Sequence, residues 1–130
     1  MTIIIKTKKE IEILREGGKR LATVLYKVKD MVKPGISTWE LDKYAEKLIK
    51  EIGDYPAFLN YRPAGAKAPF PASLCVSVND EVVHGIPSKE KILKEGDIVS
   101  LDLGLKHEGL FTDMALTVLV AVPGGVVNKG

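Results

Sequence analysis

The sequence predicts a single α+β domain in which two amphipathic helices precede a set of mostly antiparallel strands. Three observations support this prediction. Apolar residues recur at steps of three and four up to residue 53, and at steps of about two from residue 74 onward. A stretch rich in proline and glycine, residues 55–71, separates the two patterns. The length of 130 residues, with 45% hydrophobic and 28% charged residues, suits one globular domain over residues 1–130.

The first helix is expected to begin after Thr7, because Thr7 and Glu10 have the spacing of a capping box. It should end before Pro34, which interrupts helices. Its apolar face comprises Ile11, Leu14, Gly18, Leu21, Leu25, Val28 and Val32. The pair Gly17-Gly18 lowers helix propensity and indicates a close packing contact. The spacing also fits a short coiled coil, although about three heptads are more typical of a helix that lies on a sheet.

A second capping box, formed by Ser37 and Glu40, begins the second predicted helix. Gly53 provides a C-cap. The expected buried stripe consists of Leu41, Ala45, Leu48 and Ile52. The following loop, residues 55–71, contains four of the seven prolines and is long enough to suggest a function.

The strands are bounded by turn residues. The turn Asn79-Asp80 separates the first two strands, and His107-Glu108-Gly109 turns a long hairpin. In this interpretation His107 is a solvated turn residue. The four predicted strands are Leu74–Val78, Glu81–His84, Ile98–Lys106 and Leu110–Val122.

Composition excludes several classes of protein. Lys and Arg total 19 and Asp and Glu 17, and this net charge of +2 is too small to indicate a specific nucleic-acid binder. One cysteine, Cys75, excludes an internal disulfide and a cysteine-based zinc site, and favours a reducing cytoplasm. The run Ile3–Ile5 is too short for a signal peptide, and no apolar run approaches the roughly 20 residues that cross a membrane.

Two carboxylates stand in the middle of apolar strands, where an uncompensated charge is costly. Asp102 and Asp113 lie eleven positions apart. A turn at His107-Glu108 would place them directly opposite each other, and a turn at Glu108-Gly109 would make them diagonal neighbours. Both registers put them on one face of the sheet. Two carboxylates there repel unless a cation lies between them. The alternative is that one or both lie at an exposed edge.

Four further residues are candidates for a site. His84 ends a predicted strand before Gly85 and is either a catalytic group or a structural hydrogen-bonding residue. Tyr61 and Phe70 flank the proline-rich loop, and either line an apolar pocket or anchor the loop. Cys75 alternates with apolar residues in its strand, where a small buried hydrophobic residue is the simplest interpretation.

The sequence resembles the N-terminal half of the type I methionine aminopeptidases, from about Ile5 to Val120. The most specific landmark is Val83-His84-Gly85-Ile86-Pro87, combined with the eleven-residue spacing of the two aspartates. The other landmarks are Ile5–Thr7, Glu10-Ile11, Leu14-Arg15, Val32–Thr38, Cys75–Val82, Gly96–Asp102 and Gly109–Asp113. The resemblance implies half of a pita-bread fold, with two helices packed on a mostly antiparallel sheet.

The resemblance also assigns roles. Asp102 corresponds to the bidentate ligand of one metal, and Asp113 to the carboxylate that bridges two metals. His84 corresponds to the imidazole that contacts the scissile amide outside the metal shell. Tyr61, Phe70 and Cys75 correspond to walls of the pocket for the methionine side chain, and aromatic and sulfur surfaces suit a thioether.

The implied activity is metal-dependent removal of the initiator methionine from nascent polypeptides, with the ribosome as an expected partner. Family members use two divalent ions, Co, Mn, Fe or Zn, which polarise the peptide carbonyl, activate water and hold the free amine. The link Arg62–Pro69 is longer than is usual in the family. The family's second half supplies the remaining ligands and the general base, so we expect a partial site here and negligible activity of these residues alone.

Two alternatives follow from the partial site. One is a non-catalytic binding module on the same fold. The other is a half-enzyme completed by the missing C-terminal half or by a second copy, because the two halves of this fold are related by a pseudo-twofold axis. We expect an exposed strand edge and an apolar surface around Val118, Val120 and Val122, which favours a homodimer.

Overall fold

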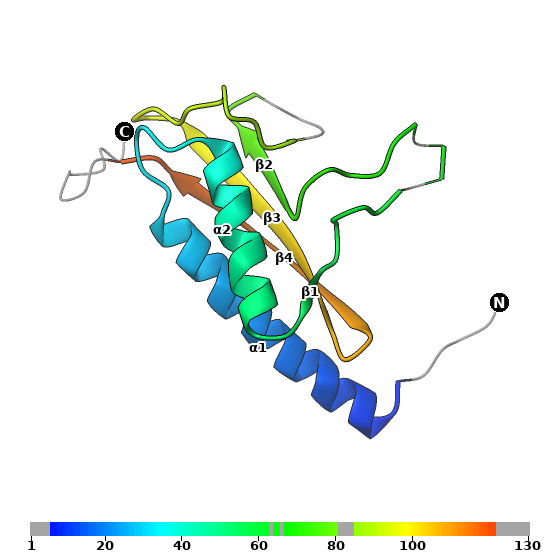
Figure 1. Ribbon diagram of the computed structural model, residues 1–130. Helices are drawn as coiled ribbons and strands as arrows, with labels where there is room; N and C mark the ends of the chain where they lie inside the picture. Colours follow the sequence, from blue (N-terminus) through cyan, green and yellow to red (C-terminus); the bar gives the residue numbers. More distant parts are fainter. Residues whose placement is uncertain (1–5, 63, 66, 81–84, 122–130) are drawn as a thin grey trace.

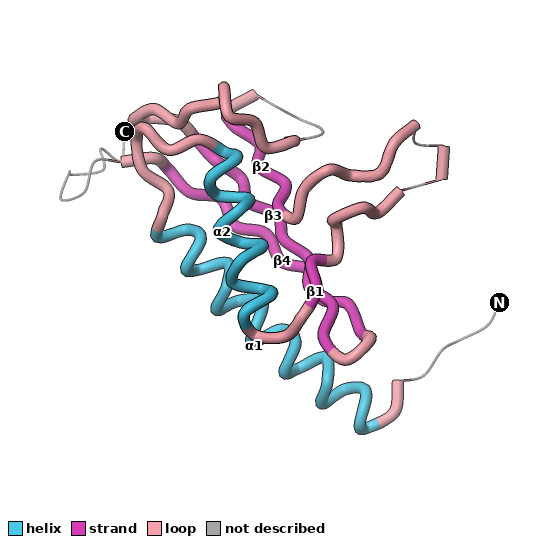
Figure 2. Tube along the Cα trace, viewed as in Figure 1, coloured by secondary structure: helices cyan, strands magenta, loops and turns pink. Residues whose placement is uncertain are grey.

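The structure is a computed structural model that describes residues 6–62, 64–65, 67–80 and 85–121. Two helices lie side by side on one face of an antiparallel sheet (Figure 1). The loop between the first two strands extends away from the helices (Figure 2). The elements are α1 (Lys8–Asp30), α2 (Thr38–Glu51), β1 (Tyr55–Pro56), β2 (Leu74–Val78), β3 (Ile98–His107) and β4 (Leu110–Leu119). The prediction of an α+β fold is confirmed.

Both capping boxes are present. The amide of Glu10 donates to the Thr7 hydroxyl at 3.1 Å, and the Thr7 amide donates back to the Glu10 carboxylate at 2.9 Å. Ser37 and Glu40 make the same pair of bonds at 3.1 and 2.8 Å. Both helices therefore begin where the sequence predicts.

The strand β3 is the centre of the sheet. It pairs with β4 along its whole length on one side, and with β2 and then β1 on the other. The turn lies at Glu108-Gly109, both with positive φ, of 47° and 83°. This is the second of the two registers considered above, in which Asp102 faces Ala115 and Asp113 faces Gly104.

The core lies between the helices and the sheet. Alternate residues of β3 point into it and are fully buried, and the other face of the sheet carries neither helix. Core residues include Leu21, Val24, Leu25, Val28, Leu41, Ala45, Ile49, Val99, Leu101, Leu103 and Leu105. Neither helix is long and apolar enough to cross a membrane, within the described ranges.

The predicted helix faces need small corrections. Ile11, near the start of α1, and Ile52, the C-cap of α2, are exposed rather than buried, and the buried residues of the helices include Val24 and Ile49 instead. The close contact of α1 is at Gly17 and not at Gly18. A Cβ atom at Gly17 would lie 3.4 Å from the Cβ atom of His107, whereas one at Gly18 would meet open space.

The interpretation of His107 as a solvated turn residue is wrong. β3 continues through His107, whose side chain is buried on the helix side of the sheet. Its Nδ1 lies 2.7 Å from the Asp54 carboxylate, which also lies 3.4 Å from Arg20 of α1. This cluster joins the hairpin to both helices.

The expectation of an exposed apolar surface at Val118 and Val120 is also wrong. Val118 packs against the core, and Val120 is buried, with its amide donating to the Asp97 carbonyl at 2.8 Å. Val122 lies outside the described residues. Among the described strands, the large hydrophobic side chains exposed on the open face are instead Tyr55, Ile98, Phe111 and Leu119.

Candidate metal centre and side-chain pocket

Three neighbouring strands bring the candidate residues together on the open face of the sheet. Cys75 of β2 is directly opposite Asp102 of β3, and Asp113 of β4 is diagonal to Asp102. The residues alternate along each strand, so their side chains leave the sheet on the side away from the helices. The prediction that Asp102 and Asp113 share one face is confirmed.

The start of β2 is fixed by a buried carboxylate. Asp42 of α2 accepts hydrogen bonds from the amides of Ser73 and Leu74 at 2.7 and 2.9 Å. Burial raises the pKa of Asp42, and these two hydrogen bonds oppose the rise. The contact places the strand that carries Cys75.

The Asp102 carboxyl is held in an unfavourable environment. Its Oδ1 atom is buried and has no hydrogen-bond partner in the described part of the chain. The pKa of Asp102 is raised from 3.8 to about 6, first by burial and then by a hydrogen bond with Asp113 and charge repulsion from it. A cation would relieve both the missing partner and the repulsion.

These two carboxylates fit a divalent cation by their chemistry, because oxygen donors with a net negative charge bind such ions. They do not complete a metal site. Among the residues the structure describes, no group of three or more His, Cys, Asp or Glu side chains is arranged to hold a metal. The partial metal site expected from the sequence therefore stays a prediction.

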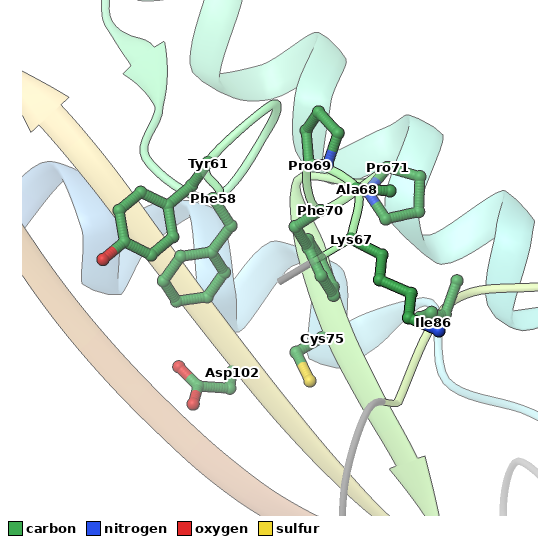
Figure 3. Close-up of a pocket in the computed structure, with 10 residues that line it drawn as sticks. All are labelled: Phe58, Tyr61, Lys67, Ala68, Pro69, Phe70, Pro71, Cys75, Ile86 and Asp102. Carbon is green, nitrogen blue, oxygen red and sulfur yellow. The ribbon is translucent and has the colours of Figure 1, made fainter. Parts of the chain in front are cut away.

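An open cavity of about 680 Å³ adjoins the Asp102 carboxylate. Figure 3 shows Tyr61 and Phe58 on the Asp102 side of this cavity, and Phe70 above Cys75. The complete lining is Phe58, Tyr61, Lys67, Ala68, Pro69, Phe70, Pro71, Cys75, Ile86 and Asp102. The sequence-based candidates Tyr61, Phe70 and Cys75 thus meet in one mostly apolar pocket beside Asp102.

Hydrogen bonds close the base of the long loop that forms the outer wall. Phe70 donates its amide to the Tyr61 carbonyl at 2.7 Å, and Asn60 donates its amide to the Phe70 carbonyl at 2.9 Å. The additional residues between Arg62 and Pro69 lie beyond this closure. Tyr61 therefore still lines the pocket although the loop is long, and its side chain is largely exposed.

Sequence reasoning missed Phe58. Its ring packs edge-on against Phe70, with the ring centres 6.3 Å apart and the planes at 85°. Its position three residues before Tyr61 in the same loop was the available signal. Ile86 was noted only as part of a motif, and it also lines the pocket.

His84 lies outside the described residues. The chain that follows it is fixed to β2, because the amide of Val76 donates to the Gly85 carbonyl at 2.7 Å. A Cβ atom at position 85 would collide with the Val76 carbonyl, so this close approach requires glycine.

Comparison with known proteins identifies the family to which this fold and these residues belong. Residues 12–126 match the model of metallopeptidase family M24. The chain belongs to this family.

The relatives within the family are more specific. A methionine aminopeptidase of Aquifex aeolicus is 47% identical over 119 residues, which are 92% of this chain and 46% of the relative. Methionine aminopeptidase 1 of Bacillus subtilis is 47% identical over 115 residues, 88% of this chain and 44% of the relative. The chain spans about half the length of the curated relatives it matches.

Comparison of the fold with solved structures also finds a methionine aminopeptidase. The crystal structure of methionine aminopeptidase from Thermotoga maritima superposes with a TM-score of 0.82 at 42% identity, over 93% of this chain and 46% of that chain. Two helices on an antiparallel sheet are thus half of the pita-bread fold, as the sequence predicts.

Proposed function

We propose that this chain forms one half of the active site of a methionine aminopeptidase, a metal-dependent exopeptidase that removes the initiator methionine from nascent polypeptides. The observation that carries the proposal is the Asp102 carboxylate, which lies beside Asp113 at the edge of an apolar pocket and has one oxygen that finds no hydrogen-bond partner among the described residues. The similarity to methionine aminopeptidases supports the choice of substrate.

In this proposal Asp102 and Asp113 are metal ligands, for Co, Mn, Fe or Zn in the two-metal site of the complete fold. When bound, the ions polarise the peptide carbonyl and lower the pKa of water. The chain's own pocket holds the methionine side chain between Tyr61, Phe70 and Cys75, where the thioether meets aromatic and sulfur surfaces. His84 contacts the scissile amide.

The partners are nascent peptides with N-terminal methionine, at the ribosome in the cytoplasm. The remaining ligands and the general base belong to the second half of the family fold, so residues 1–130, as a single domain, bind metal incompletely. We expect no measurable release of methionine from a Met-Ala-Ser peptide by this chain with any divalent ion. Turnover that persists through purification and disappears in Asp113→Ala would contradict this.

Metal binding by the 130-residue chain tests the proposal directly. Equilibrium dialysis against Mn²⁺ should show uptake that is lost in both Asp102→Asn and Asp113→Asn. The matched control is Asp30→Asn, an exposed aspartate at the end of α1, which should leave the uptake unchanged. Uptake that survives both site variants, or no uptake at all, would reject the metal site and favour the non-catalytic binding module.

A further inference from the structure

Gly104 occupies a central position on the open face of the sheet. It follows Asp102 by two residues on the same face of β3 and is directly opposite Asp113 in β4. Glycine weakens a strand interior, because it has no side chain to pack and loses more backbone entropy on folding than other residues. Its φ is not positive, so the backbone does not require glycine here.

The reason for glycine at position 104 is steric, because its neighbours leave no room for a side chain. A Cβ atom at Gly104 would lie 2.9 Å from the Cβ atom of Ala57 and 2.9 Å from Cε1 of the Phe58 ring. Both distances are too short for carbon atoms in van der Waals contact. The backbone of this segment is also held in place, because the Ala57 amide donates to the Gly104 carbonyl at 3.0 Å.

The Phe58 ring that is seated on Gly104 lines two cavities. The pocket of about 680 Å³ contains Phe58, Cys75 and Asp102 in its lining. A second, mostly apolar cavity of about 420 Å³ contains Phe58, Gly104 and Asp113 in its lining. Figure 3 shows the Phe58 ring over β3 beside Asp102. Phe58 and Tyr61 line both cavities, with Asp102 in one and Asp113 in the other, and Phe58 is the one of the two that packs on Gly104.

We propose that Gly104 is a positioning residue that sets the width of the methionine pocket by seating Phe58 against β3. A side chain at position 104 would push the ring away from the sheet and join the two cavities. The pocket would then be wider, and the surface around Asp102 would be open to water. The inference depends on the proposed function only in naming the ligand of the pocket, because the packing itself needs no metal.

Cys75 provides a direct readout, since it is the only cysteine and lines the pocket together with Phe58. The rates of its reaction with small iodoacetamide and with bulky pyrenyl maleimide are measured in the native chain with EDTA present. The ratio of the bulky to the small rate reports the width of the pocket and cancels changes in thiol reactivity. We expect Gly104→Ala to raise this ratio at least about fivefold, because the added methyl group overpacks the seat.

The control is Gly18→Ala, the same substitution at a glycine of α1 where a Cβ atom meets open space, and it should leave the ratio within about twofold of its original value. Phe58→Leu alone should also raise the ratio. The double variant tests the coupling of the two positions. Gly104→Ala should raise the rate ratio less in the Phe58→Leu background than in the original chain, because the ring that the methyl group displaces is absent there.

An unchanged ratio in Gly104→Ala, or equal effects of the methyl group with and without the Phe58 ring, would overturn the proposal. If Gly104→Ala does not fold, an unchanged ratio in Phe58→Leu would overturn it instead. These results are independent of Mn²⁺ uptake, so failure of the proposed metal site and failure of the Gly104 seat are distinguishable.

Discussion

At the scale of single residues, the carboxyl pair of Asp102 and Asp113 has an electrostatic cost that the described residues leave uncompensated. Asp102 is surrounded by apolar side chains and faces a second carboxylate, which raises its pKa to about 6. Such an arrangement lowers the free energy of unfolding of the metal-free chain. At a site that binds a cation, the bound ion raises the free energy of unfolding again. In the proposed metal site, the same residues would therefore link metal binding, pH and folding stability.

The pH dependence of stability follows from that shift. The pKa of Asp102 is 3.8 in the unfolded chain and about 6 in the folded chain. Between these pH values the folded chain therefore binds more protons than the unfolded chain. The free energy of unfolding therefore falls as pH rises through this interval, and levels off above it. In urea unfolding with EDTA, Asp102→Asn should be more stable than the original chain by about 1–2 kcal/mol at neutral pH, with allowance for solvent screening. Near pH 4 the two should be nearly equal. A difference that does not vary with pH would contradict the assignment.

At the scale of elements, local signals determined what could be predicted. The caps at Thr7 and Ser37 and the bounds of β2 depend on neighbouring residues, and the sequence predicts them correctly. The hairpin register depends on which two residues adopt positive φ, and the sequence allows two choices. In the structure these residues are Glu108 and Gly109. The seat of Phe58 on Gly104 joins residues 46 positions apart, and no local pattern indicates such a contact.

The contact between α2 and β2 makes a prediction at this scale. Asp42→Ala removes the acceptor for two buried amides, Ser73 and Leu74, and should lower the free energy of unfolding by about 2–4 kcal/mol. Asp42→Asn keeps an acceptor oxygen and should lose less. Asp30→Ala, at an exposed position, should change it by no more than about 0.5 kcal/mol. Chemical denaturation measures all three, and equal losses in Asp42→Ala and Asp30→Ala would show that the contact does not hold β2.

At the scale of the whole molecule, the two faces of the sheet differ in what covers them. The helices bury one face, and the other presents the carboxylates, the pocket and exposed apolar side chains. Phe111 is 61% exposed on this face, and among the described strands β4 pairs with β3 alone. Apolar side chains and a strand edge in such positions favour association with another polypeptide. The relatives are about twice as long as this chain, so each has a comparable length of polypeptide beyond the matched half.

For these 130 residues alone, a second copy is the simplest cover, and an isologous dimer would bring two copies of Asp102 and Asp113 toward one centre. Four carboxylates there repel, so we expect Mn²⁺ to tighten the dimer and EDTA to loosen it. Sedimentation velocity at micromolar concentration, with Mn²⁺ or with EDTA, measures this.

Phe111→Ser should shift the chain toward monomer in both conditions, since it removes an exposed apolar side chain of the open face. The control is Tyr26→Ser at an exposed position of α1, which should leave the monomer–dimer equilibrium unchanged. A chain that is monomeric with and without Mn²⁺ would show that the open face does not pair with itself.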